Sequence, residues 1–252
     1  MIESISKILG SCDSENTVLP PTELFNEGWL LRLALDWFDR NRFGQHPLSF
    51  APEARWYSNA LLPSRFLPRK RNDTNAESFT HADGIIGHFG FYEKDHGYIK
   101  LQPDSKQFVV IEAKLGSPLS KGTKNSPTFN QAARTVACIA HMIYKAEINP
   151  ASIDRLAFFV IAPNVQIRKG IFKDFVSKDC IEKKVRNRID LFQDAHDIWF
   201  DKFLLTLDHM EIGLMAWENV LMEMPRTDEV DILNEFYAKC LHYNLSRVAN
   251  PM

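Results

Sequence analysis

The chain has 252 residues, of which 45% are hydrophobic and 25% are charged, and its formal net charge is −2. This balance is typical of a soluble globular protein with a sizeable core. The net charge excludes a chain that coats nucleic acid through bulk positive charge, but it leaves room for a local basic groove. The length is compatible with one α/β domain that carries an added helical layer.

Cysteine spacing and hydropathy favour a cytoplasmic protein that does not enter a membrane. The four cysteines lie far apart and form neither a zinc knuckle nor a Cys-x-x-Cys redox pair. Residues 1–10 lack the apolar run of a signal peptide, and the longest strongly apolar run, Leu156 to Ala162, is too short to cross a bilayer. We therefore expect reduced thiols and a cytoplasmic location.

The first half of the chain is expected to form one helix and then three strands. Residues 1–19 are polar and weakly patterned, and we expect a loosely ordered start. Thr22 is a suitable N-cap for a largely buried helix that ends near Arg40. Strands are predicted over three segments, at Arg55–Leu62, His81–Phe91 and Phe108–Leu115.

The second half is expected to add one strand and several helices. Ser126 followed by Pro127 indicates a helix start, and apolar residues then repeat at helical spacing as far as Ile143. Arg155–Pro163 is a continuous apolar run, which is typical of a strand covered on both faces. After Gly170 the pattern is helical to the end, in blocks near residues 172–188, 192–207, 214–224 and 229–247.

This order predicts an α/β protein with a mixed central sheet flanked by helices and a C-terminal helical layer. We expect residues 20–165 to form the core and residues 166–252 to form a helical extension packed on it, as one domain overall. The pattern leaves open whether the extension is a homodimer surface, a DNA-contacting layer or a cover for the core.

Two acidic side chains and a lysine lie near the ends of neighbouring predicted strands. Glu112 and Lys114 are two residues apart in the third strand, so they point to the same face. Asp83 lies at the start of the preceding strand, and Gly84 leaves room beside it. Buried charges are costly unless they are paired or bind a metal, and two converging carboxylates form an oxygen site for a hard cation such as Mg²⁺.

An acidic-x-Lys triplet alone is weak support, because a chain of this length holds a few by chance. The sequence contains two others, at residues 104–106 and 182–184, and neither lies in an apolar strand that follows a carboxylate-bearing strand. Context therefore favours the copy at residues 112–114. The residues alone leave a structural ion pair between Glu112 and Lys114 as an equal alternative.

Several motifs share one arrangement along the chain. Asp83 is followed by the triplet at residues 112–114 and then by a helix that carries Gln131 and Arg134. This arrangement resembles the restriction-endonuclease-like PD-(D/E)XK superfamily, and an uncharacterised bacterial branch of it is similar over residues 55–58, 81–84, 112–114 and 130–134. Alanine rather than proline precedes Asp83, which departs from the family motif. The resemblance implies the family's αβββαβ core over residues 22–163.

The resemblance also implies a metal-dependent nuclease that hydrolyses phosphodiester bonds in DNA. Its cofactor would be Mg²⁺, for which Mn²⁺ can substitute. Asp83, Glu112 and the backbone carbonyl of Ala113 would hold the metal, and Lys114 would support the nucleophile.

Two further residues have roles that the resemblance suggests. The family's acidic helix residue corresponds best to Glu27, which would complete the metal shell or position water, with Glu23 as a substitute. A glutamate at the helix edge without such a role is the alternative. Gln131 would orient a ligand or a phosphate, and an ordinary solvated helix face is the alternative for Gln131 and Arg134.

Basic residues near the predicted site are candidates for substrate binding, namely Lys121, Lys124, Arg134, Arg69 and Arg71. The two lysines lie in a loop that leads to the helix start at Ser126, where free backbone N–H groups favour an anion. Arg69 and Arg71 precede Asp83 and are expected to line the same groove. A loop that is merely exposed is the alternative.

Two other functions remain compatible with the sequence. One is a catalytically inactive nuclease-fold protein that binds nucleic acid or a protein partner. The other is a metal-dependent hydrolase of a small phosphorylated substrate. The complete set of acidic residues and lysine argues against the first, and the modest net charge keeps the second open.

Overall fold

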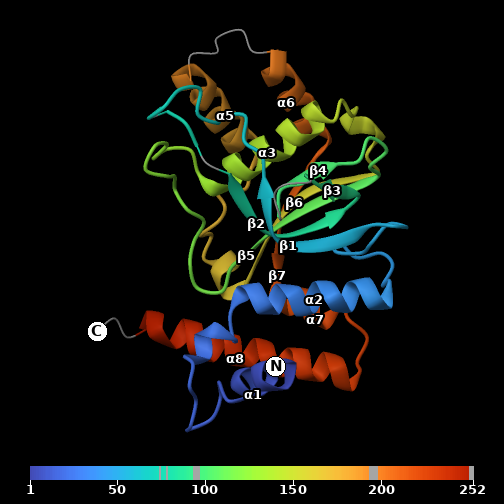
Figure 1. Cartoon of the computed structure of the whole chain (residues 1–252), viewed down its shortest axis with the longest axis vertical. Helices are drawn as coiled ribbons and strands as arrows, with labels where there is room; N and C mark the ends of the chain where they lie inside the picture. The colour runs from blue at the N-terminus through green and yellow to red at the C-terminus, as the bar shows by residue number, and fades with distance from the viewer. Residues whose placement is uncertain (74, 78, 93–96, 193–197, 250–252) are drawn as a thin grey trace.

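The computed structural model describes residues 1–73, 75–77, 79–92, 97–192 and 198–249, and its centre is a five-stranded sheet (Figure 1). The strands lie in the order β1-β2-β5-β6-β7. β1, β2 and β5 pair antiparallel, whereas β5, β6 and β7 pair parallel. Their bounds are β1 (Arg55–Leu62), β2 (Thr80–Gly87), β5 (Gln107–Ala113), β6 (Arg155–Ala162) and β7 (Glu211–Ala216). The α/β class and the mixed central sheet are confirmed.

Helices cover both faces of this sheet. The helices are α1 (Ile2–Gly10), α2 (Glu27–Asn41), α3 (Gln131–Lys145), α4 (Asn164–Arg168), α5 (Lys178–Phe192), α6 (Ile198–His209), α7 (Trp217–Met222) and α8 (Asp228–Ala249). Two 3₁₀ turns (Pro21–Glu23 and Pro150–Ser152) and a hairpin of β3 (Phe89–Phe91) and β4 (Ile99–Leu101) complete the described elements. None of the described helices is long and apolar enough to span a bilayer.

Each face of the sheet forms its own hydrophobic core. On one face α3, α5 and α6 pack over the strands, and on the other face α2, α7 and α8 do so (Figure 1). Because side chains alternate along a strand, Val110 of β5 points into the first core and Ile111 into the second. Every residue of β5 is buried, so any charge on this strand lies inside the protein.

The predicted first strand is confirmed with the same bounds, and the predicted second strand is divided. β2 ends at Gly87, whose φ is +152°. A Cβ at this position would lie 2.1 Å from the carbonyl oxygen of Gln107, so only glycine fits. The chain leaves the central sheet here, and Phe89–Phe91 pairs with β4 instead.

Both predicted helix starts were wrong by several residues. Thr22 lies in a 3₁₀ turn, and α2 is capped by Asn26, whose side chain accepts the N–H of Trp29 at 3.0 Å. Ser126 pairs with Thr123 through both backbone groups in a turn, and α3 begins only at Gln131 after the cap Asn130. In each case a nearby asparagine took the capping role, because its side chain serves as well as serine or threonine.

Two terminal expectations also need correction. Residues 1–19 include the helix α1, and Asp13 after it forms an ion pair with Lys239 of α8 at 2.6 Å. The segment after residue 166 is not purely helical, since β7 is the edge strand of the central sheet. Gly213 of β7 lies against the ring of Phe159, where a Cβ would come within 3.4 Å, so this strand packs closely on β6.

Candidate active site

The site forms where β2 and β5 separate. Their ladder ends at the pair Gly84 and Ile111, so the residues beyond it no longer pair between β2 and β5. Asp83 fills this place: its Oδ2 accepts the backbone N–H of Ala113 at 2.9 Å. The carboxylate therefore lies between the two strand ends. The sequence predicts this position near Glu112.

Gly84 brings helix α2 close to this point. A Cβ on Gly84 would lie 2.9 Å from Leu31 and 3.1 Å from Leu35 of α2, so a larger residue would push the helix away. Ala82, two residues earlier, belongs to the core on the α3 side. Residues two apart in a regular strand share a face, so the strand is irregular at Asp83, which helps to aim its carboxylate into the gap.

Glu112 is fully buried at 0% exposure, on the face covered by α3. Its Oε2 accepts a hydrogen bond from Nε2 of Gln131 at 2.8 Å, and its Oε1 accepts one from Oγ1 of Thr135 at 3.4 Å. Thr135 follows Gln131 by one helical turn, so both donors share a face of α3. Sequence reasoning found Gln131 and missed Thr135, although the i, i+4 spacing was a usable signal.

Lys114 lies close to both carboxylates. Its Nζ is 3.6 Å from Oε2 of Glu112 and 3.9 Å from Oδ2 of Asp83, and the residue is only 9% exposed. Its backbone is fixed on both sides, because its N–H donates to Ile161 at 2.8 Å and its carbonyl accepts Nε1–H of Trp217 at 3.1 Å. The expectation that Glu112 and Lys114 share a face agrees with this contact.

The electrostatics of the site are unbalanced. Burial raises the pKa of Glu112 to about 8, and the neighbouring charge of Asp83 adds to this effect. Lys114 and the hydrogen bond from Gln131 act in the opposite direction. If both carboxylates ionise, they and the one ammonium group carry a net negative charge in a largely buried place, which a bound cation would compensate.

The donor atoms fit a hard cation that keeps several waters. Asp83 and Glu112 supply carboxylate oxygens, and the carbonyl of Ala113 lies on the same edge of β5 as its N–H, toward Asp83. Within the described ranges, no three side chains of His, Cys, Asp or Glu gather closely enough to hold an ion. Mg²⁺ is often held by one or two carboxylates with water and substrate phosphate, so the pair suffices.

Glu27 does not join this group. It begins α2 and is partly buried. Its charge acts on Cys240 of α8, whose pKa is raised to about 12 mainly by burial and further by Glu27. Glu23, the suggested substitute, is exposed in the preceding 3₁₀ turn. The structure brings together Asp83, Glu112, Lys114 and Gln131, and within the described ranges Glu27 does not form a three-residue metal-binding group with the two acids.

Gln131 connects the site to the loop at residues 116–130. Its side-chain oxygen accepts the N–H of Ser120 at 3.1 Å, and its own backbone N–H donates to the carbonyl of Ser120 at 2.9 Å. The same amide donates to Glu112. The side chain of Gln131 thus fixes both Glu112 and the loop that carries Lys121 and Lys124.

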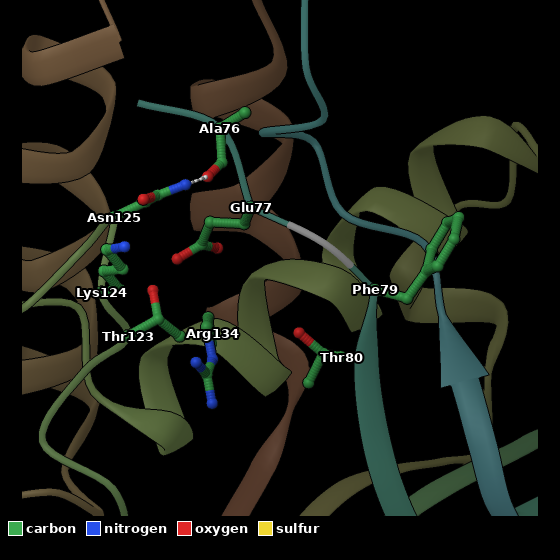
Figure 2. Close-up of a pocket in the computed structure, with 8 residues that line it drawn as sticks. All are labelled: Ala76, Glu77, Phe79, Thr80, Thr123, Lys124, Asn125 and Arg134. Atoms are coloured by element: carbon green, nitrogen blue, oxygen red, sulfur yellow. Dashed lines mark hydrogen bonds between the residues drawn. The ribbon is translucent and has the colours of Figure 1, made fainter. Parts of the chain in front are cut away.

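The predicted phosphate-binding residues have different surroundings. Lys121 and Lys124 are exposed, and Lys124 lines a pocket of about 260 Å³ together with Arg134 (Figure 2). The predicted anion site at a helix start on Ser126 was wrong, because α3 begins at Gln131. A Cβ on Gly122 would lie 2.3 Å from the carbonyl oxygen of Ser126, so the folded-back loop requires glycine at this position.

Arg69 and Arg71 have different surroundings. Nη1 of Arg69 donates to the carbonyl of Phe192 at 2.6 Å, and its guanidinium carbon lies 3.7 Å from the centre of that ring. Its Nε also lies 3.5 Å from Asp73. These contacts anchor the segment to the end of α5, whereas Arg71 is exposed.

Comparisons with known proteins find no relative of this chain. No family model, no curated protein and no solved structure matches the chain. We therefore infer function from the chain's own side chains: two acids from neighbouring strands, a lysine close to both and a glutamine that fixes one acid.

Proposed function

We propose that the protein is a metal-dependent nuclease of the PD-(D/E)XK type that hydrolyses phosphodiester bonds in DNA. The observation that carries this proposal is the position of Lys114, within 3.9 Å of both Asp83 and Glu112 where two strands separate. The order α2, β1, β2, β5, α3, β6 is compatible with an αβββαβ core, in which the β3–β4 hairpin is an insertion.

The distances favour a site over a structural ion pair. Charge-assisted N–H···O bonds in well-formed pairs are about 2.7–2.9 Å long. Lys114 lies 3.6 Å from Glu112 and 3.9 Å from Asp83, so it serves neither acid as a close partner. Both carboxylates keep acceptor capacity toward the gap between the strands, which is the property that a cation site needs.

Each residue then has a defined role. Asp83, Glu112 and the carbonyl of Ala113 would hold Mg²⁺, with Mn²⁺ as a substitute, and the ion supplies charge neutralisation at the phosphate and a more acidic water. Lys114 orients the nucleophile or stabilises the extra negative charge of the transition state. Gln131 keeps Glu112 in place through its 2.8 Å hydrogen bond.

The direct test is cleavage of single-stranded, duplex and branched DNA with Mg²⁺, with Mn²⁺ and with a chelator. We expect metal-dependent cleavage that Asp83→Asn and Glu112→Gln abolish. The chain offers matched controls in its two other acidic-x-Lys triplets, where Asp104→Asn and Glu182→Gln should leave cleavage unchanged.

The remaining outcomes separate the alternatives. Binding of DNA without cleavage in any metal would favour an inactive nuclease-fold protein. Hydrolysis of nucleotides or sugar phosphates without cleavage of DNA would favour a small phosphorylated substrate. Cleavage that persists in both Asp83→Asn and Glu112→Gln would contradict the assigned site.

A further inference from the structure

A second buried glutamate lines the pocket beside the candidate active site. Glu77 is only 5% exposed, and within the described part of the chain neither of its carboxylate oxygens accepts a hydrogen bond of normal geometry, although the nearby hydroxyl of Ser126 lowers the pKa of this carboxyl. Figure 2 shows this carboxylate facing the pocket, with Lys124 of the loop beside it and with Thr123 of the loop and Arg134 of α3 below it. A buried acceptor without a donor is costly, so the geometry of this pocket calls for a ligand that brings donors.

The pocket is adjacent to the proposed catalytic centre. Arg134 follows Gln131 by three residues on α3, a rise of about 4.5 Å along the helix axis. Thr80, another wall residue, precedes Asp83 by three residues on β2. A DNA strand whose phosphate lies at Asp83 and Glu112 therefore has a neighbouring nucleotide within reach of Glu77.

The size and charge of the pocket restrict the ligand. Its volume of about 260 Å³ is below the roughly 300–1,000 Å³ of sites for drug-sized molecules, so it suits one nucleobase. Lys124 is exposed and lines the pocket, where it can meet the backbone phosphate. The side-chain amide of Asn125 holds the pocket edge by donating to the carbonyl of Ala76 at 3.1 Å.

The unpartnered carboxylate selects among the four bases. An ionised glutamate offers two acceptor oxygens and no donor. Guanine presents two adjacent donors on one edge, N1–H and the 2-amino group, which match these oxygens. Adenine and cytosine present one amino group beside an acceptor nitrogen, and thymine presents one N–H between two carbonyls, so each of them would place an acceptor near the carboxylate.

We propose that the pocket around Glu77 binds an unpaired guanine base next to the cleaved phosphate, an inference that rests on the proposed nuclease function. A base inside a duplex cannot present this edge to a side pocket, so the strand must be single or the base must be flipped out. The preferred substrate is therefore single-stranded or locally unpaired DNA with guanine beside the cleavage point.

The test compares guanine with hypoxanthine, which lacks only the 2-amino group. Short labelled oligo-dT strands with one central deoxyguanosine, deoxyinosine, deoxyadenosine or deoxycytidine are titrated with the full chain, and fluorescence anisotropy is measured in a chelator. We expect about tenfold tighter binding of the guanine strand than of the inosine strand. Glu77→Gln should remove this preference, and the exposed Glu235→Gln should keep it.

Other results would overturn the proposal. Equal binding of guanine and inosine strands by the parent protein, a preference for another base, or a guanine preference that survives in Glu77→Gln would each do so. If Glu77→Gln does not fold, Glu77→Asp keeps the charge near Arg134 and Arg188 and shortens the reach, and it should also lose the preference.

This assay separates the two proposals because it needs no metal and no turnover. A protein that distinguishes guanine from inosine but cleaves no DNA would keep the pocket and contradict the nuclease. A metal-dependent nuclease without base preference would keep the nuclease and contradict the pocket.

Discussion

Glu112 and Glu77 are buried glutamates beside the same helix, α3, and their surroundings differ in kind. Glu112 accepts hydrogen bonds from two side chains of α3. Glu77 accepts no hydrogen bond of normal geometry among the described residues, but it lies near the charges of Arg188 and Arg134. Glu112 thus accepts hydrogen bonds from side chains, whereas Glu77 interacts mainly with nearby positive charges.

The pKa shifts of Glu112 and Glu77 share one cause and differ in the next. Burial raises the pKa of both groups. The next influence has the opposite sign at the two places, because Asp83 raises the pKa of Glu112 further, whereas Arg188 lowers that of Glu77. At Glu112 the charge of Asp83 outweighs that of Lys114, which suits a metal ion, whereas Glu77 has positive charge nearby but no N–H donor, which suits a polar organic group.

The largest effect that separates the two acids is expected from the lysine at the first one. Lys114→Ala should reduce the cleavage rate by about 10²–10³-fold, the size typical of losing one transition-state donor, while metal affinity stays similar. Single-turnover kinetics at saturating Mg²⁺ give the chemical step. Lys106→Ala, in the triplet at residues 104–106, is the matched control, and equal rates for Lys114→Ala and the parent would remove the catalytic assignment.

A smaller effect is expected at the glutamine that satisfies Glu112. Gln131→Ala should weaken metal binding by about 10–100-fold, as is usual for groups that orient a metal ligand. The Mg²⁺ dependence of cleavage measures this shift. Gln131→Glu places a second acid against Glu112 and should be worse than alanine; if both variants matched the parent, Gln131 would have no positioning role.

The pH dependence of stability tests the charge difference directly. The pKa of Glu112 is raised from 4.5 to about 8, so the unfolded chain releases this proton first and stability falls as pH rises between these values. In a chelator, the melting temperature of Glu112→Gln should exceed that of the parent by several degrees near pH 8 and by little near pH 5, since about 1 kcal/mol shifts it by roughly 2–4 °C.

Glu77→Gln is the internal control for this measurement. Its charge compensates Arg188, which is 2% exposed, so its removal leaves a buried arginine with less compensation. We expect no comparable gain near pH 8. Equal stabilisation by both variants would show that the two sites do not differ in charge balance.

The smallest predicted effect concerns the loop that Gln131 fixes. The double variant Lys121→Ala with Lys124→Ala should weaken binding of all DNA sequences alike. It should lower the slope of log affinity against log salt by about two units, roughly one for each lost phosphate contact. An unchanged slope in filter-binding or anisotropy titrations would place the phosphates elsewhere.

The sequence predicts the candidate catalytic group better than the pocket, because the two depend on interactions of different range along the chain. Glu112 and Lys114 share a face through strand alternation, which is local, and Asp83 lies on the neighbouring strand. The pocket needs Glu77, a loop that folds back at Gly122 and the helix residue Arg134 to meet. No local periodicity signals such a meeting.

The errors in the predicted fold have equally specific causes. Asn26 and Asn130 were overlooked as caps because Thr22 and Ser126 fit the same rule. The helical block predicted near residues 214–224 overlaps β7, because this strand is short and half-buried and its conformation depends on pairing with β6. These errors moved the expected anion site but left Asp83, Glu112 and Lys114 unaffected.

The central claim is that Asp83 and Glu112 share one cation, and calorimetric titration with Mn²⁺ tests it most directly. We expect one bound ion for the parent protein and for Lys114→Ala, loss of binding in Asp83→Asn and in Glu112→Gln, and retention in Glu77→Gln. Unchanged Mn²⁺ binding in either Asp83→Asn or Glu112→Gln would contradict it.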